Sequence, residues 1–173
     1  MASAESLLSE PGADLVSAVS IEQIAGSLSR PHGKRFGILV HAVLSVVALN
    51  AGRDDIAKVA SVQGRIFGAS KDEVDAAVET VAEVIRHPTI VRGAIENSCR
   101  REVPVTLRLQ DDLVVEGVVD LAYEEKNGWT VIDYKTDFEI QGRVDEYTRQ
   151  VWLYALAISR ATGKKSRPVL LRV

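Results

Sequence analysis

The stretch of sequence that decides the fold is residues 117–136, GVVDLAYEEKNGWTVIDYKT. Two runs rich in valine, isoleucine and aromatic residues flank the dipeptide Asn127-Gly128, which is the strongest short signal for a β-hairpin. We therefore predict two antiparallel strands, at residues 113–123 and 129–135, joined by Asn127-Gly128 as a two-residue loop.

Three charged residues interrupt these apolar strands: Asp120, Asp133 and Lys135. In the predicted register Asp120 lies opposite Lys135, and Asp133 lies diagonally from Asp120 on the same face, with Cβ atoms about 7–8 Å apart. Two partly buried carboxylates at that spacing can share a divalent cation, whereas a slip of one residue would turn Asp120 to the other face. A structural Asp–Lys ion pair at a sheet edge is the plain alternative.

The Asp–Asp–Lys arrangement suits the cleavage of phosphodiesters. A hard cation such as Mg²⁺ prefers oxygen ligands and takes few of them from protein, so that water and phosphate complete its shell. The bound metal lowers the pKa of a water molecule and neutralises charge on the phosphate, and a nearby ammonium positions the water or stabilises the transition state. Asp120 and Asp133 are therefore candidate metal ligands, and Lys135 is a candidate catalytic residue.

The rest of the chain predicts helices first and strands afterwards. Capping signals and apolar residues at helical spacing indicate helices in the first half, and alternating apolar and polar residues indicate a strand after Arg101. The predicted helices cover residues 20–29, 37–49, 54–67, 70–87, 89–97 and 145–162, and the further strands cover residues 103–110 and 168–173. We expect an α/β domain with a mixed sheet of about four strands, the helix at 145–162 on one face, and the N-terminal helices around the rest.

Composition argues against several classes of protein. The net charge of −3 over 173 residues is unlike that of a non-specific nucleic-acid coat protein, which would be basic. The single cysteine, Cys99, excludes an internal disulfide and a cysteine-ligated iron–sulfur cluster. No apolar run reaches the length of a membrane span, and the N-terminus lacks the pattern of a secretory signal, so we expect a cytoplasmic protein with no membrane partner.

Together these residues resemble the PD-(D/E)XK nuclease superfamily, and more narrowly the RecB-like nuclease domain at the C-terminus of bacterial helicase–nucleases of the RecB and AddA type. Five motifs follow in the order of that family: residues 37–41 (GILVH), 102–104 (EVP), 116–121 (EGVVDL), 131–136 (VIDYKT) and 150–154 (QVWLY). The resemblance implies a restriction-endonuclease-like α/β core, here residues 36–173, after an N-terminal helical or linker segment at residues 1–35.

The resemblance also implies roles for individual residues. The implied catalytic residues are Asp120, Asp133 and Lys135, and the implied metal ligands are His41, Asp120, Asp133 and the carbonyl of Tyr134. The residues implied to position DNA are Gln150, Tyr154, Arg149 and Glu102. From the residues alone, His41 is equally a core histidine, Tyr154 a packed side chain, and the other three solvated surface groups.

The implied function is Mg²⁺- or Mn²⁺-dependent hydrolysis of DNA phosphodiesters. We expect an exonuclease or single-strand-processing enzyme that acts on single-stranded DNA or duplex ends, with a helicase, in recombination and repair in the bacterial cytoplasm. The chain has no G-x-x-x-x-G-K-[ST] sequence and hence no ATP site of that kind, so a UvrD/AddA-type motor would lie on the same parent chain or on a separate protein. Two alternatives remain: a catalytically silent DNA-binding or docking module of a helicase–nuclease complex, and a sequence-specific restriction-type endonuclease.

Overall fold

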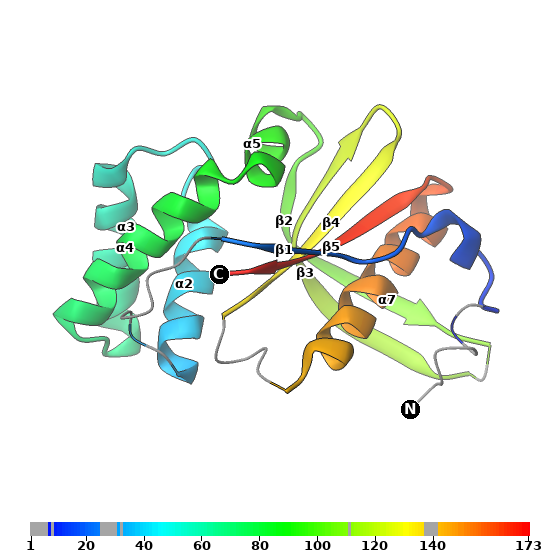
Figure 1. The fold of residues 1–173 in the computed structure, drawn as a ribbon, viewed down its shortest axis with the longest axis horizontal. Helices are drawn as coiled ribbons and strands as arrows, with labels where there is room; N and C mark the ends of the chain where they lie inside the picture. The colour runs from blue at the N-terminus through cyan, green and yellow to red at the C-terminus, as the bar shows by residue number, and fades with distance from the viewer. Residues whose placement is uncertain (1–6, 8, 25–30, 32, 111, 137–141) are drawn as a thin grey trace. The chain divides into compact units, whose positions relative to one another are not determined.

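The computed structural model describes residues 7, 9–24, 31, 33–110, 112–136 and 142–173, and it contains a five-stranded sheet with helices (Figure 1). The helices of these residues are α2 (Lys34–Val46), α3 (Arg53–Phe67), α4 (Lys71–Arg86), α5 (Pro88–Ile95) and α7 (Val144–Thr162), with a short 3-10 helix, η1, at Ala13–Leu15. The strands are β1 (Ser20–Gln23), β2 (Arg100–Arg108), β3 (Val114–Glu125), β4 (Gly128–Lys135) and β5 (Ser166–Arg172). Their order in the sheet is β1-β5-β4-β3-β2.

The sheet is mixed, as the sequence predicted. β2 pairs antiparallel with β3, and β3 pairs antiparallel with β4. β5 runs parallel to β4: the Trp129 amide donates to the Lys165 carbonyl at 2.8 Å, and further along both strands the Val173 amide donates to the Lys135 carbonyl at 2.9 Å. Two parallel strands need a long crossover connection, and α7 lies in the segment that links β4 to β5.

The chain divides into two compact units. The first unit comprises Met1–Ile21, Ser98–Asp133 and Val144–Leu170, and the second unit comprises Glu22–Asn97, Tyr134–Arg143 and Leu171–Val173. The first unit holds α7 with β2 and β3, and the second holds α2, α3, α4 and α5. The predicted boundary between residues 35 and 36 stays a prediction.

In the first unit, α7 packs against β2 and β3 (Figure 1). Tyr154, Ala155 and Ile158 of the helix are buried in one cluster with Val119 and Val131 of the sheet. This is the apolar stripe that the helical spacing predicted. Each fully buried aliphatic side chain stabilises the fold by about 1.5–3 kcal/mol relative to an exposed one, so this cluster is a principal source of the unit's stability.

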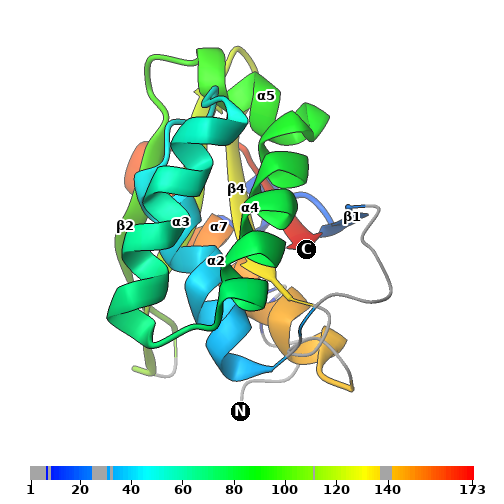
Figure 2. The same ribbon diagram turned by 90° about the vertical axis from the view of Figure 1, so that its left-hand side faces the viewer.

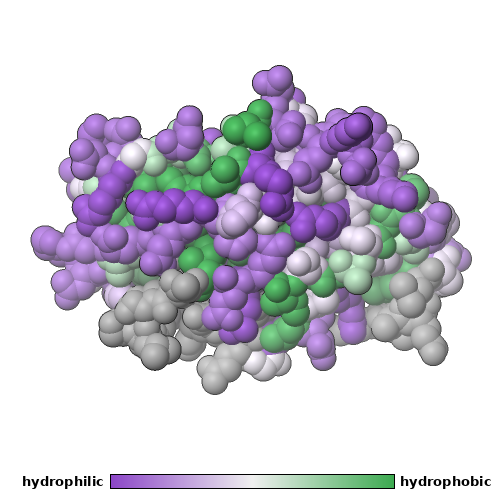
Figure 3. Space-filling view, turned by 45° about the horizontal axis from the view of Figure 1, so that its top comes forward, coloured by the Kyte–Doolittle hydropathy of each residue, from purple (hydrophilic) through white to green (hydrophobic). Residues whose placement is uncertain are grey.

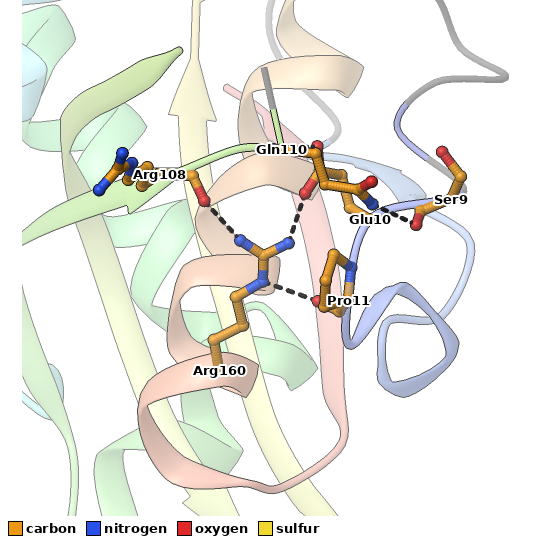
Figure 4. A network of polar contacts seen from close by, with 6 residues as sticks. All are labelled: Ser9, Glu10, Pro11, Arg108, Gln110 and Arg160. Atoms are coloured by element: carbon orange, nitrogen blue, oxygen red, sulfur yellow. Dashed lines mark hydrogen bonds and ion pairs between the residues drawn. The ribbon is translucent and has the colours of Figure 1, made fainter. Parts of the chain in front are cut away.

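The N-terminal segment of the first unit is attached to β2 and α7 through Arg160 (Figure 4). The Arg160 guanidinium donates to the carbonyls of Pro11 and Arg108, both at 2.7 Å, and pairs with the Glu10 carboxylate at 2.6 Å. The Gln110 amide donates to the other carboxylate oxygen of Glu10 at 3.0 Å. Burial by itself raises the pKa of Glu10, but the hydrogen bonds from Gln110 and Arg160 and the charge of Arg160 outweigh it and hold that pKa below its usual value.

The β3–β4 hairpin turns at Lys126-Asn127 and not at the predicted dipeptide. Glu125 pairs with Gly128, which begins β4 with a φ of 134°. A Cβ atom on Gly128 would lie 2.2 Å from the Lys165 carbonyl oxygen, so the close approach of the chain just before β5 requires glycine here. The predicted register was therefore wrong by two residues along the ladder. Because the shift is even, each side chain keeps its predicted face.

The predicted helix at residues 20–29 is wrong in its first part. Ser20–Gln23 form β1, and residues 25–29 lie outside the described residues. The Ile24 amide donates to the Arg172 carbonyl of β5 at 2.9 Å. Pairing with β5 thus outweighs the local capping signal that favoured a helix. β1 is also the reason that the sheet has five strands where the sequence predicted about four.

In the second unit, α2, α3 and α4 pack side by side (Figure 2). α2 begins at Lys34, earlier than predicted, and ends at Val46, where the backbone becomes extended. The capping box predicted at Ser70 and Glu73 is confirmed at the start of α4. Glu73 also accepts two hydrogen bonds of 2.9 Å from the Arg35 guanidinium, and these bonds lower the pKa of Glu73.

Polar side chains cover most of the face shown in Figure 3, with smaller hydrophobic areas between them. Exposed apolar side chains include Ile66 of α3 and Ile95 of α5. Singly exposed apolar residues of this kind are normal on a folded protein. Within the described part of the chain, no helix combines the length and the apolar character needed to cross a membrane.

Candidate functional site

Two aspartates occupy opposite positions on β3 and β4 of the first unit. The paired residues run as far as Leu121 and Ile132, and the next positions in the same register are Asp120 and Asp133. Directly opposed residues have Cβ atoms about 4.5–5.5 Å apart, which is closer than the diagonal placement that the sequence predicted. Asp133 is 3% exposed, and Asp120 is half-buried. Carboxylates this close and this shielded repel each other, so a proton or a cation is needed to stabilise them.

The same strand carries the candidate catalytic lysine. β4 continues from Asp133 through Tyr134 to Lys135, its last residue, and side chains alternate along a strand, so Asp133 and Lys135 lie on one side of β4. The predicted pairing of Lys135 with Asp120 was wrong, because Asp133 takes the position opposite Asp120. The Lys135 Nζ donates to the Tyr134 carbonyl at 3.3 Å. An ammonium therefore lies beside the carbonyl that the family resemblance implies as a metal ligand.

His41 and Tyr134 are neighbours in the second unit. Their rings lie edge to face, with centroids 6.0 Å apart and planes at 71°. His41 is only half-buried, whereas Leu39 and Val40 of the same helix are fully buried. Its ring thus lies at the border of the apolar side of α2, next to Tyr134, and its role as a metal ligand stays a prediction.

The carboxylate pair suits a hard divalent cation. Mg²⁺ is commonly held by one or two carboxylates, with water and substrate phosphate oxygens completing its shell. Asp120 and Asp133 meet that requirement because both offer oxygen ligands, one is buried, and they occupy opposed positions on paired strands. Across the residues that the structure describes, no three His, Cys, Asp or Glu side chains come together as a metal-binding group. The observed placement therefore supports the two aspartates as a minimal donor set, without the histidine.

A second constellation joins α7 to β3 in the first unit. The Gln150 Nε2 donates to the Tyr154 hydroxyl at 2.8 Å. The phenol ring of Tyr154 lies directly against the backbone of Gly117: a Cβ atom on this glycine would be 2.3 Å from the hydroxyl oxygen and 2.5 Å from Cε1. Two motifs that are far apart in the sequence, the glycine three positions before Asp120 and the glutamine–tyrosine pair, thus interlock.

The two remaining residues implied to position DNA lie at different places in the first unit. Arg149 is half-buried on α7, next to Gln150. Glu102 is exposed on β2 and has a left-handed φ of 51°, which is uncommon for a residue other than glycine. The β2–β3 register passes from Arg101–Leu121 to Val103–Val119, so Glu102 stands in the same row of the sheet as Asp120. The roles of Arg149 and Glu102 toward DNA stay predictions.

Sequence reasoning missed the contact between Gly117 and Tyr154 and the left-handed backbone at Glu102. Gly117 carried a weak signal, since a glycine inside a strand often marks a close approach of another group. What approaches it cannot be read from residues 116–121 alone. Glu102 carried no comparable signal, because glutamate has no preference for positive φ.

Comparison with known proteins places these residues in a family. The family model described as the PD-(D/E)XK nuclease superfamily matches residues 20–173. The match covers β1, all five helices named above and the strands that carry Asp120 and Asp133. It confirms the resemblance and the fold expected from the sequence.

The relatives found among curated proteins share one description, that of a subunit of an ATP-dependent helicase/nuclease. Those from Acetivibrio thermocellus and Thermoanaerobacter sp. (strain X514) are 29% identical over 151 residues and 30% identical over 160 residues, and each alignment covers 75% of this chain and 12% of the relative. The one from Alkaliphilus metalliredigens is 28% identical over 159 residues, covering 78% of this chain and 13% of the relative. The chain therefore spans about one eighth of the length of these relatives.

Proposed function

The chain belongs to the PD-(D/E)XK nuclease superfamily, and from this premise we propose that it hydrolyses phosphodiester bonds of DNA with the help of Mg²⁺ or Mn²⁺. The observation that carries the proposal is the opposed position of Asp120 and Asp133 on paired strands, with Lys135 on the same side of β4 as Asp133. A strand-borne carboxylate pair with one member buried is costly for the fold unless it serves a cation.

Each member of this set has a distinct task in the proposal. Asp120 and Asp133 hold the divalent cation, which when bound supplies positive charge at the phosphate and a water of lowered pKa. Lys135 orients the attacking water or stabilises the negative charge that develops on the phosphate oxygens. His41 and the Tyr134 carbonyl are the proposed additional ligands, and their ring contact keeps the two residues together.

The substrate and the partner follow from the relatives. Their printed descriptions combine a helicase with a nuclease, which supports DNA as the substrate and a helicase motor as the partner, on the same parent chain or on a separate protein. We propose action on single-stranded DNA or duplex ends during recombination and repair in the bacterial cytoplasm. Gln150, Tyr154, Arg149 and Glu102 are the residues proposed to position the strand.

One observation favours a second candidate, a silent DNA-binding or docking module. The described residues form no group of three potential metal-ligating side chains, and a site with only two carboxylates binds a divalent cation more weakly than a full cage. The two candidates differ in one result: the silent module binds DNA and cleaves none of it.

Cleavage of a labelled single-stranded oligonucleotide in Mg²⁺ or Mn²⁺ tests the proposal. We expect the wild-type chain to cut, and we expect Asp133→Asn and Lys135→Met to lose cutting while keeping the fold. Matched controls are Asp112→Asn and Lys58→Met, which change an exposed aspartate and an exposed lysine that lie in surface ion pairs. Binding without cleavage by the wild type would select the silent module, and cleavage at one duplex sequence only would select a restriction-type enzyme.

A further inference from the structure

We propose that Tyr154, held by Gln150, is a positioning residue that presses on β3 at Gly117 and thereby keeps Asp120 opposite Asp133. The inference rests on the proposed function, since it concerns the residues proposed to hold the divalent cation. It assigns Tyr154 to the support of the metal site and not to the direct DNA contact that the family resemblance implies. All five residues belong to the first unit.

The first support is the closeness of the contact. The space that a Cβ atom would occupy on Gly117 is filled by Tyr154, with the hydroxyl oxygen at 2.3 Å, Cε1 at 2.5 Å and Cζ at 2.6 Å from that position. Real Cβ atoms do not approach other atoms so closely, so any larger residue at 117 must displace either the ring or the strand. Interiors packed at this density transmit such a displacement instead of absorbing it.

The second support is that the phenol is held in place. Tyr154 is only 5% exposed, and its hydroxyl accepts a hydrogen bond of 2.8 Å from Gln150 one helical turn earlier. A buried hydroxyl without a partner would cost about 1–3 kcal/mol, so this bond stabilises one orientation of the ring. With its hydroxyl bonded inside the fold and its ring against Gly117, Tyr154 presents little surface to DNA.

The third support is the path from Gly117 to Asp120. Val119, the residue before Asp120, is buried in the same cluster as Tyr154, so the ring and its neighbours contact β3 on both sides of residue 118. In the row of Asp120, the neighbouring strand contributes Glu102 with its left-handed backbone, between the regular pairs Arg101–Leu121 and Val103–Val119. A regular ladder residue is replaced there by an irregular one, and α7 provides the complementary restraint.

The experiment measures Mn²⁺ uptake by the intact chain without DNA, by titration calorimetry, and DNA affinity in Ca²⁺ as a separate readout. The variants are Gly117→Ala, which adds the clashing methyl group, and Gly117→Ala combined with Tyr154→Ala, which makes room for it. We expect the single variant to bind Mn²⁺ about tenfold more weakly, at the lower end of what loss of a supporting residue costs a metal site. We expect the double variant to bind as well as Tyr154→Ala alone.

Two further variants keep the proposal testable if Gly117→Ala does not fold. Tyr154→Phe and Gln150→Leu remove only the hydrogen bond, and we expect each to weaken Mn²⁺ binding while leaving DNA affinity in Ca²⁺ unchanged. A fall in DNA affinity with unchanged Mn²⁺ binding would overturn the inference and show a direct DNA contact. Failure of the wild type itself to take up Mn²⁺ would overturn the proposed function, and the inference with it. Weakened Mn²⁺ binding in these variants, with normal uptake by the wild type, supports both.

Discussion

The first unit buries carboxylates at two places, and the two places solve the same electrostatic problem in opposite ways. Glu10 is 6% exposed and is neutralised by the Arg160 guanidinium and the Gln110 amide. Asp133 is 3% exposed, and the residue opposite it in the register is a second carboxylate, Asp120. A buried acid beside an arginine stabilises a fold, whereas two acids placed in opposition lower its stability until a cation binds. The difference separates a structural carboxylate from a functional one.

The largest expected effect of breaking this comparison is on catalysis. Asp133→Asn removes one charge of the proposed metal site, and we expect the rate of single-strand cleavage in Mn²⁺ to fall by about 10³-fold, equivalent to about 4 kcal/mol of lost transition-state stabilisation. Glu10→Gln should leave the rate per folded molecule within about twofold of wild type, because Glu10 lies in the separate Arg160 network. Initial rates on a labelled oligonucleotide measure both. Equal losses in the two variants would show that the distinction is wrong.

The next largest effect concerns stability. Arg160→Met leaves the Glu10 carboxylate buried beside an apolar side chain, and we expect the free energy of unfolding to fall by about 2 kcal/mol. The value is below that of a fully buried pair because the Arg160 side chain is 24% exposed. Urea unfolding measures the change, and Arg65→Met on the exposed side of α3 is the matched control. A loss no larger than in the control would mean that the network in Figure 4 contributes little.

A smaller effect should appear when Mn²⁺ is added to the folded chain. A ligand at ten times its dissociation constant raises the free energy of unfolding by about 1.4 kcal/mol. We expect this gain in the wild type and in Glu10→Gln, and we expect its loss in Asp133→Asn, where one of the two carboxylates is gone. Thermal unfolding with and without Mn²⁺ provides the measurement. Ca²⁺ added at the same concentration distinguishes a selective site from general charge screening.

The smallest effect is on the pH dependence of stability. The pKa values of Glu10 and Glu73 are lowered in the folded state from a usual value of 4.5, Glu73 mainly by its hydrogen bonds to Arg35. Each therefore adds stability that is fully present above about pH 5 and is lost as the pH falls through the folded-state pKa. We expect unfolding free energies measured between pH 7 and pH 3 to decline below pH 5, and to decline less steeply in Glu10→Gln. An identical slope in this variant would contradict the lowered pKa of Glu10.

Much of the fold was predictable because it depends on neighbours in the chain. The capping box at Ser70, the apolar stripe of α7 and the alternation along β2 each need only a few consecutive residues, and all three appear as predicted. The errors concern contacts between distant residues. Ser20–Gln23 carried a helix signal but pair with β5, and the hairpin turn moved because Gly128 is needed where the chain comes close at Lys165.

The candidate site shows the same division. Asp120, Asp133 and Lys135 could be selected from the sequence because charged residues stand out between apolar strand positions. Their pairing could not be settled, because a register shift of two residues preserves every face and leaves the pattern of apolar residues unchanged. The shift exchanges Lys135 for Asp133 opposite Asp120, which turns a predicted cross-strand ion pair into a carboxylate pair.

The amino-acid sequence by itself determined the family, the hairpin that carries the acidic residues, and the faces on which they lie, because these depend on residue type and on the period of two along a strand. Only the tertiary structure decided the register of that hairpin, the closure of Gly117 against Tyr154, and the partner of Glu10. The physical reason is that close packing and buried charge pairs join residues far apart in the chain, and no local pattern encodes which distant group will fill a given space.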